Sequence, residues 1–532
     1  MEREWDVIVL GSGLGGLSAA LSFANKGKRV LVLEKSISPG GCASSFLKKG
    51  YLFESGATTL VGFEPGLPMD RLVKELGIQF PLLPIERSMV VHLGNHTIER
   101  FKDRKLWIKE VLRVFGGGFR MVLFWKLCYF VSDRLWNLSA RYKFFPFRKF
   151  RDIWNTLCVF RPLDLVVFCV SFLSVRFVQK IFFLHKNLKW IQFLDEQLLI
   201  TNQTTSKSAP FSMAAAGLTY PNLQNYIVSG GMVELSRVLI SRLRELGGEF
   251  LTKQEVIHFA KQQNLAANWE VKTKNRDLNV FTAPILVSNL PIWNLVKLTD
   301  SLPRLYIQAK SMETGIWGAF TMGIVLRLES DILLGEKECL HHQIHLDEAL
   351  PYGGGQSVFV SLSHPDDPER SKEGTRILSL STHLSEPESW KRDQDYPKKK
   401  KEIETILLTA LEKSFPWFFR EKIVFYHSGT PVTWQTWTGR KWGRVGGIPS
   451  SYFFNPFRML SNRSEDPTLL LTGDTVYPGQ GIPAVVLGGL NAVEQFYQGK
   501  VRLISEPNPR PWAKRWYAFR RFISKFQEHP PI

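Results

Sequence analysis

Residues 7–16 decide the fold, and they read Val7-Ile8-Val9-Leu10-Gly11-Ser12-Gly13-Leu14-Gly15-Gly16. The four consecutive apolar residues predict a buried strand, and the glycine-rich turn leads into a helix expected over Gly13 to Gly27. A second apolar run, Arg29 to Glu34, predicts the next strand. A strand, a helix and a strand in this order open a parallel α/β sheet.

The turn fits the pattern G-x-G-x-x-G, in which each glycine has its own task. Gly11 permits the tight turn, Gly13 lets the backbone approach a pyrophosphate, and Gly16 allows the helix to pack closely on the strand. The other residues of the turn are Ser12, Leu14 and Gly15. Glu34 ends the second strand, where its carboxylate can accept hydrogen bonds from ribose hydroxyls. The sequence therefore predicts a Rossmann-type domain that binds a dinucleotide at the helix N-terminus.

The far end of the chain favours FAD over NAD. Leu469 to Leu471 predicts a buried strand that leads into Thr472-Gly473-Asp474 and a second glycine-rich helix start, Pro478 to Ala484. A long cofactor needs such a segment, because Asp474 can bind ribityl hydroxyls while Gly481 to Pro483 approach the flavin ring. The sequence has no second dinucleotide fingerprint. A quinone, oxygen or a separate reductase is therefore the expected electron partner.

Over nearly its whole length the chain resembles the FAD-dependent family of phytoene desaturases, carotenoid cis-trans isomerases and retinol saturases. The matching pieces are Asp6 to Lys35, Pro39-Gly40-Gly41, Gly50-Tyr51-Leu52-Phe53-Glu54-Ser55-Gly56, Ser229-Gly230-Gly231-Met232, Glu255-Val256, Val287-Ser288-Asn289 and Gly473 to Gly481. Besides the turn and Glu34, the resemblance implies cofactor contacts at Lys35, Gly40, Gly41, Cys42, Ala43, Val256, Gly473, Asp474, Gly481 and Ile482. Many desaturases have Arg where this chain has Cys42, which favours the isomerase and saturase side.

A polyene offers no carbonyl to polarise and no acidic proton, so the flavin is expected to perform the chemistry while the protein positions it. Three reactions at carbon-carbon double bonds of a hydrophobic polyene fit: desaturation by hydride removal, saturation by hydride addition, and cis-trans rotation without net redox change. No residue is assigned as an acid or base. Two alternatives stay open: a lipid-carrying escort similar to GDP-dissociation inhibitors, and an amine-oxidising flavoprotein.

Charge and aromatic residues distinguish one internal segment. The chain carries a formal charge of +19 with 38 Phe and 16 Trp, and residues 101–200 hold eighteen Lys and Arg against seven Asp and Glu. This pattern predicts a helical, basic-aromatic insert that binds an anionic membrane surface or lines a substrate tunnel. Its most apolar run, Pro162 to Leu184, contains Asp164, Arg176 and Lys180, so peripheral attachment is favoured over a transmembrane span. No nucleic-acid-binding module accompanies the charge.

The C-terminal residues have a similar composition. Aromatic and apolar residues that share one helical face are Trp512, Trp516, Phe519, Ile523 and Phe526, with cations around them. The expected division is an FAD-binding domain over 1–100, 206–300 and 461–505, the insert over 101–205, a mixed-sheet substrate domain over 301–460, and an amphipathic basic tail over 506–532.

Other polar residues carry weaker signals. His341, His342 and His345 lie near Asp347, but their neighbours predict a strand and a turn, so ordinary histidines are favoured over a metal site. The five cysteines are scattered without a C-x-x-C pair and predict reduced thiols. The first residues lack a signal-peptide pattern. We therefore expect a cytoplasmic, peripherally membrane-associated protein without a metal.

Overall fold

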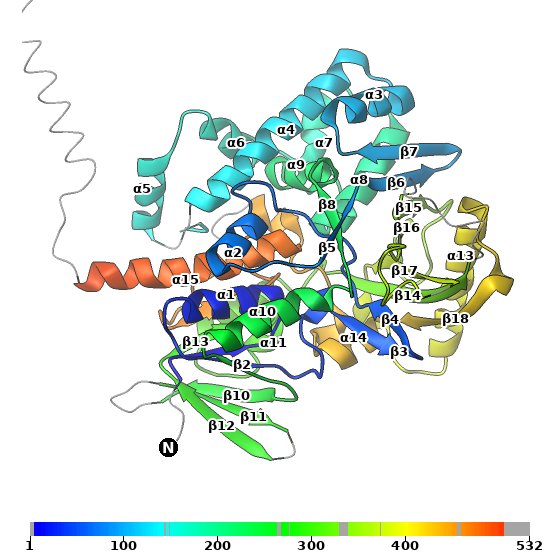
Figure 1. Ribbon diagram of the computed structural model, residues 1–532. Coiled ribbons are helices and arrows are strands. Elements are labelled where there is room, and N and C mark those ends of the chain that lie inside the picture. The colour runs from blue at the N-terminus through cyan, green and yellow to red at the C-terminus, as the bar shows by residue number, and fades with distance from the viewer. Residues whose placement is uncertain are drawn as a thin grey trace, which may run out of the picture.

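A five-stranded parallel sheet forms one half of the molecule (Figure 1). The computed structural model describes residues 5–504, except 143–144, 148, 263–267, 276, 329–338, 373 and 455–458, so the tail expected over 506–532 lies outside the described residues. In spatial order the strands are β19 (Leu469–Leu471), β13 (Ile285–Ser288), β1 (Val7–Leu10), β2 (Val30–Leu33) and β9 (Glu249–Leu251). The three central strands are buried on both faces, as the continuous apolar runs of parallel strands require.

Helices cover one face of the parallel sheet and a small antiparallel sheet covers the other (Figure 1). The helices are α1 (Leu14–Ala24), α10 (Val233–Glu245) and α15 (Ile482–Ile504). The small sheet consists of β10 (Glu255–Lys261), β11 (Trp269–Lys274) and β12 (Leu278–Ala283). Helices α1 and α15 pack so closely that a Cβ atom on Gly489 would lie 2.3 Å from the carbonyl oxygen of Gly15. The close packing of α15 on α1 therefore requires glycine at position 489.

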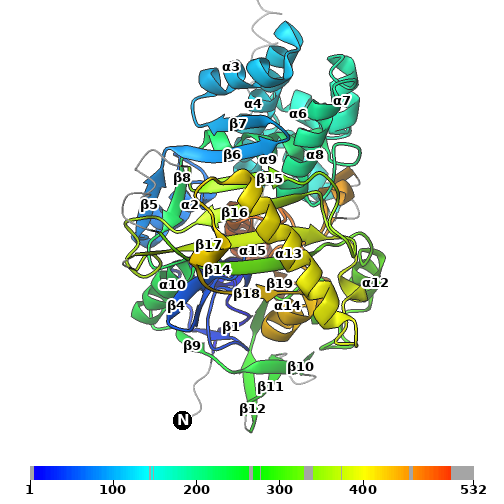
Figure 2. The same cartoon turned by 90° about the vertical axis from the view of Figure 1, so that its right-hand side faces the viewer.

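A seven-stranded mixed sheet forms the other half. In spatial order its strands are β18 (Ile423–Gly429), β14 (Gly318–Arg327), β17 (Thr375–Leu384), β16 (Ser357–Leu362), β15 (His341–His345), β6 (Arg87–Leu93) and β7 (His96–Phe101). Helix α13 (Tyr396–Ser414) lies across one face (Figure 2), where Ile403 and Leu407 are fully buried. Strands β6 and β7 join this sheet although they precede the insert, because β6 pairs in parallel with the distant β15. No local sequence pattern encodes such a pairing.

Shorter elements connect the two halves. They are the hairpin of β3 (Ser45–Lys48) and β4 (Tyr51–Glu54), the pair β5 (Leu82–Ile85) and β8 (Asn225–Val228), and the helices α2 (Pro68–Leu76), α11 (Ile292–Leu295), α12 (Pro303–Ser311) and α14 (Pro431–Thr438).

The predicted insert is helical. Within the predicted bounds of 101–205 lie α3 (Arg104–Phe115), α4 (Gly118–Arg141), α5 (Phe150–Val159), α6 (Asp164–Val170), α7 (Val175–Ile181) and α8 (Leu188–Asn202). Helix α9 (Phe211–Thr219) follows this segment and packs against α4 and α8. Asp103 begins α3 by accepting hydrogen bonds from the backbone N–H groups of Lys105 and Leu106. The interior is filled by aromatic rings, among them the fully buried Trp107 and Trp190. None of the helices in the described part of the chain is both long and apolar enough to cross a membrane.

Candidate active site

One cavity of about 1360 Å³ lies between the two large sheets. Its walls include the carboxyl ends of β1 and β2, where open α/β sheets bind their ligands. The predicted cofactor residues that line it are Gly11, Ser12, Gly13, Leu14, Gly15, Glu34, Lys35, Gly40, Gly41, Cys42, Ala43, Val256, Gly473, Asp474, Gly481 and Ile482. Gly16 is the exception, since it packs behind the wall. The structure thus brings residues from both ends of the chain to one cavity, and their contacts with a cofactor stay a prediction.

Three glycines of the first turn occupy positions where a Cβ atom would be strained or would overlap with a neighbour. Gly11 has a φ angle of +89°, which side chains rarely adopt. A Cβ atom on Gly13 would lie 2.3 Å from Nδ2 of Asn289, and one on Gly16 would lie 2.6 Å from the carbonyl oxygen of Gly11. The bare backbone therefore faces the cavity at the N-terminus of α1, which is the cradle that a pyrophosphate requires.

Glu34 organises this turn as well as facing the cavity. Its carboxylate accepts hydrogen bonds from Ser12 N–H at 2.8 Å, from Ser12 Oγ at 2.6 Å and from Ser36 N–H at 2.8 Å. Next to it, Lys35 Nζ lies 2.6 Å from a carboxylate oxygen of Glu255. The predicted contact of Glu34 with ribose stays a prediction, but its position on the cavity wall fits one.

The second glycine turn lies directly against the first. Gly40 forms an isolated bridge with Gly13 and has a φ angle of +102°, and a Cβ atom there would lie 2.7 Å from the carbonyl oxygen of Ala43. Cys42 follows this turn on the cavity wall. Burial raises the pKa of its thiol, although the nearby Arg440 guanidinium opposes the change. Cys42 is therefore a protonated thiol at neutral pH.

An ion pair that the sequence did not predict links the last segment to this turn. Arg440 donates to Oδ2 of Asp474 at 2.8 Å and to the carbonyl oxygen of Arg444 at 2.6 Å. Burial lowers the pKa of Arg440, but Asp474 and Cys42 raise it more, so the guanidinium stays charged. Arg440 lies outside every recognised motif, and no local pattern could have indicated its partner.

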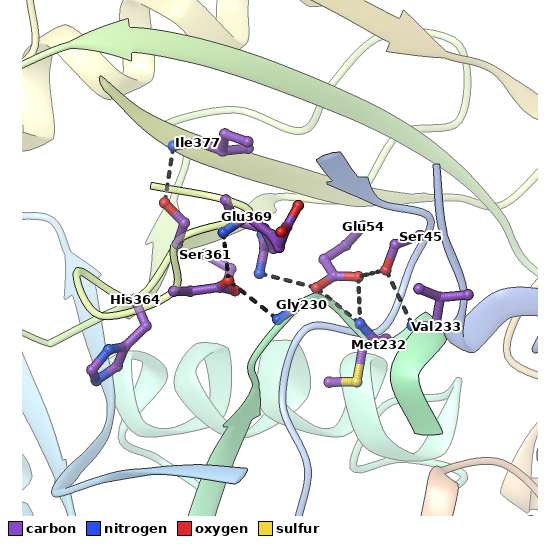
Figure 3. Close-up of polar contacts among 12 residues, drawn as sticks. Ser45, Glu54, Gly230, Met232, Val233, Ser361, His364, Glu369 and Ile377 are labelled. Atoms are coloured by element: carbon purple, nitrogen blue, oxygen red, sulfur yellow. Dashed lines mark hydrogen bonds and ion pairs between the residues drawn. The ribbon is translucent and has the colours of Figure 1, made fainter. Parts of the chain in front are cut away.

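A second buried network joins two motifs that lie far apart in the sequence (Figure 3). The Glu54 carboxylate accepts from Ser45 Oγ at 2.6 Å and from Met232 N–H at 3.1 Å, and it forms an ion pair with Arg370 at 2.9 Å. Burial raises the pKa of Glu54, while Arg370 and Ser45 oppose this. The network fixes the β3–β4 hairpin to the start of α10, beside the cavity.

The far wall of the cavity consists of strand residues that the sequence did not single out. The wall residues from the seven-stranded sheet include Ala319, Thr321, Ser357, Phe359, Ser381, Thr382, His383, His427 and Ser428. Burial lowers the pKa of His383 and of His427 to about 4, so both rings are neutral at neutral pH. Strand alternation alone cannot tell which face of such a sheet meets a ligand.

Behind this wall a chain of hydrogen bonds runs into the insert. Ser357 Oγ donates to Glu196 at 2.5 Å and accepts from Gln343 at 3.1 Å. Gln343 accepts in turn from Gln197, whose amide oxygen is bonded to Arg100 at 2.6 Å. Arg100 is fully buried and stacks on Trp107, and burial lowers its pKa to about 10. The wall at Ser357 is therefore held by the insert.

The three neighbouring histidines lie in β15 and are buried. His341 is bonded to Ser361 at 2.9 Å and His342 to His92 at 3.1 Å. Within the described ranges, no group of three His, Cys, Asp or Glu side chains is placed to hold a metal ion.

Three features together define a dinucleotide-dependent oxidoreductase. They are a parallel sheet with a glycine cradle, an acidic residue at the end of its second strand and a cavity shared with a mixed sheet. Residues 14–495 match the family of flavin containing amine oxidoreductases, and the chain belongs to this family. It is therefore a flavin-dependent enzyme, as the paired motifs predicted.

The relatives agree with the resemblance drawn from the motifs. The chain is 26% identical to a prolycopene isomerase of Daucus carota over 520 residues, which cover 92% of this chain and 79% of the relative. It is 23% identical to an all-trans-retinol 13,14-reductase of Danio rerio, with 84% and 79% covered. It is 24% identical to a 4,4'-diapolycopene oxygenase of Methylomonas sp, with 91% and 96% covered. The predicted family resemblance is confirmed.

Solved structures confirm the predicted α/β fold class. Cyclohexylamine oxidase from Brevibacterium oxydans has a TM-score of 0.58 at 13% identity, with 94% of this chain and 100% of that chain covered. An oxidoreductase from Methanosarcina mazei has a TM-score of 0.57 at 16% identity, with 92% and 100% covered. At such identities the likeness shows the fold alone.

Proposed function

We propose that the protein binds FAD and converts cis double bonds of a long, carotenoid-like polyene to trans bonds. Support for the substrate class comes from the relatives, among which the prolycopene isomerases of Daucus carota and of an Oncidium hybrid cultivar share 26% identity with this chain. Support for isomerisation, rather than saturation or desaturation, comes from the side chains of the cavity.

The observation that carries the choice is that the carboxylates of the cavity lining are already engaged by other residues. Each carboxylate among the described lining residues is already bonded: Glu34 to Ser12 and Ser36, Glu255 to Lys35, and Asp474 to Arg440. Burial lowers the pKa of His383 and of His427 to about 4, which makes both neutral rings weak bases, and it raises the pKa of Tyr220 to about 12. Saturation needs a proton donor and desaturation a base, whereas rotation about a double bond needs neither. Cys42 and Tyr220 are weak acids because burial raises their pKa values, and the bonded carboxylates are engaged by other residues, so these groups favour rotation over the two reactions that transfer a proton.

The chain's own residues bind the reactants and exclude water. The turn from Gly11 to Gly16 would hold the pyrophosphate, Glu34 the adenosine ribose, and Asp474 with Ile482 the flavin end. Bound FAD would supply the reversible electron transfer that lets a conjugated double bond rotate. Apolar wall residues such as Phe359 and Trp434 would hold the polyene beside it and keep water out.

Product mass in deuterated water separates the three reactions. The purified protein would be incubated anaerobically in D₂O with a poly-cis carotenoid, in one sample with the flavin reduced and in another with the flavin oxidised and a quinone added as electron acceptor. The products would be analysed by chromatography and mass spectrometry. We expect trans isomers of unchanged mass without deuterium. A product that gains hydrogen or deuterium would instead establish saturation, and one that loses two hydrogens would establish desaturation. The variant Gly16→Ala, which we expect to lose the cofactor, is the matched negative control.

A further inference from the structure

Helix α5 turns its apolar face to solvent. Phe150, Trp154, Leu157 and Cys158 have the spacing i, i+4, i+7, i+8, which normally marks the face that a helix buries in the core. All four are exposed, and Phe150 is 92% exposed. The opposite side carries Asp152, which is buried and paired with Arg463 at 2.9 Å. The amphipathic pattern of this helix is therefore inverted.

Helices α6 and α7 continue this arrangement. Leu165, Phe168 and Cys169 of α6 and Phe172, which follows the helix, are exposed, while Asp164 at the first position of α6 is fully buried. Exposed residues of α7 are Phe177, Lys180 and Ile181. Fourteen of the 27 large apolar side chains that are exposed in the described chain lie between residues 119 and 188. Single exposed apolar residues are ordinary, but such a concentration marks an interaction surface.

We name this surface the outward face. It comprises Phe150, Trp154, Leu157, Leu165, Phe168, Phe172, Phe177 and Ile181. Helices α5 and α6, which carry most of it, lie on the side of the insert away from the seven-stranded sheet (Figure 1).

The charges around the outward face are positive. Lys149, Arg151, Arg161 and Lys180 are exposed, and none of these four forms an ion pair with another described residue. The carboxylates of the same stretch are withdrawn from solvent. Asp164 accepts from Arg141 at 3.1 Å and from Tyr142 at 2.8 Å, and Asp152 is paired as above. The surface therefore presents apolar side chains and unneutralised cations together.

We propose that the outward face docks on a membrane surface that contains anionic lipid. Apolar side chains would enter the boundary between headgroups and acyl chains, while the cations remain at headgroup level. Charge argues against two other occupants. Residues 506–532 carry six Lys and Arg against two Glu, and a second copy would bring the same cations, so both would repel this face. The proposal does not depend on the reaction that the cavity performs.

Vesicle binding by the full-length protein tests this surface. Sedimentation with vesicles of phosphatidylcholine, alone or mixed with phosphatidylglycerol, would be compared for the native protein and two double variants. Trp154→Ser with Phe168→Ser removes apolar contacts, and Arg151→Glu with Lys180→Glu reverses charge. We expect binding to the mixed vesicles to fall about tenfold or more in each variant. The matched control, Leu278→Ser with Ile307→Ser, removes apolar residues elsewhere that are at least as exposed and should bind like the native protein.

A local probe separates the outward face from other membrane contacts. Cys158 and Cys169 are exposed on this face, so Cys158→Ser leaves Cys169 for an environment-sensitive fluorophore. We expect a blue shift when mixed vesicles are added and none with phosphatidylcholine alone. Binding without a shift would mean that another part of the chain holds the membrane, and would overturn the proposal. Self-association that disappears in the Trp154→Ser, Phe168→Ser variant would assign the face to a second copy instead.

Discussion

The guanidinium of Arg440 lies 2.8 Å from the carboxylate of Asp474, at the point where the last segment of the chain reaches the cavity. The Arg440 side chain is 10% exposed and that of Asp474 is 20% exposed. Both residues line the cavity beside Cys42. The pair therefore connects the predicted second cofactor segment to the α14 region, which carries no cofactor motif.

Asp474→Asn should both destabilise the protein and weaken flavin retention. The change leaves the Arg440 charge buried without its partner, which costs about 3 kcal/mol. Urea unfolding monitored by fluorescence and the flavin absorbance of the purified protein measure the two effects. Glu412→Gln is the control, because the exposed Arg420–Glu412 pair should contribute less than about 1 kcal/mol. Equal effects of the two variants would contradict the role given to the Arg440–Asp474 pair.

Gly16→Ala should abolish flavin retention through packing, although Gly16 does not line the cavity. The new methyl group would lie 2.6 Å from the Gly11 carbonyl oxygen and 2.8 Å from Cβ of Asn289, so the turn must move. We expect colourless protein with a lowered melting temperature. Gly355→Ala is the matched control, since its nearest neighbour would be 3.6 Å away. A yellow Gly16→Ala protein would show that the turn tolerates the displacement.

Local patterns predicted one half of the fold closely. The strands expected at Val7 to Leu10 and Leu469 to Leu471 have these bounds in the structure, and the helix expected from Gly13 begins at Leu14. Such elements are encoded by short apolar runs and glycine turns, which act within a few residues. These elements meet on one cavity because parallel strands end at the same edge of a sheet.

The other parts of the fold and of the site depend on contacts between residues that lie far apart in the sequence. Arg440 follows α14 whereas Asp474 follows β19, and their side chains meet only in the folded protein. The cavity wall at Ser357 and His383 is set by strand register in a sheet assembled from separate segments. The exposed apolar residues of α5 and α6 have the same spacing as buried faces, so sequence alone left two readings open, a membrane surface and a tunnel lining. Only the exposure of Phe150 and Phe168 favours the first.

His345 should make the protein less stable in mild acid. It is buried, neither ring nitrogen has a partner among the described residues, and burial lowers its pKa to about 4. The unfolded ring binds a proton near pH 6.5, so below that pH the unfolded state takes up protons that the folded state refuses. Stability is therefore fully present above about pH 6.5 and falls as the pH drops toward 4.

The variant His345→Gln removes this titration. Between pH 7 and pH 5 the native protein should lose about 2 kcal/mol more unfolding free energy than the variant does, measured by urea unfolding at both values. His258→Gln, at an exposed position, should leave the loss unchanged. An identical loss in the native protein and in His345→Gln would mean that other groups cause the acid sensitivity.

Alkylation rates should show whether burial or Arg440 dominates at Cys42. Burial raises the pKa of this thiol and Arg440 opposes it, and burial is the larger effect. The thiolate is the reactive form, so iodoacetamide at pH 8 should modify the exposed Cys158 and Cys169 at least about tenfold faster than Cys42, as peptide mass spectrometry would measure. In urea all five cysteines should react alike, which controls for intrinsic differences. If Cys42 reacted first in the folded protein, Arg440 would be holding a thiolate beside the cavity, and the assignment of Cys42 as a neutral wall residue would have to be withdrawn.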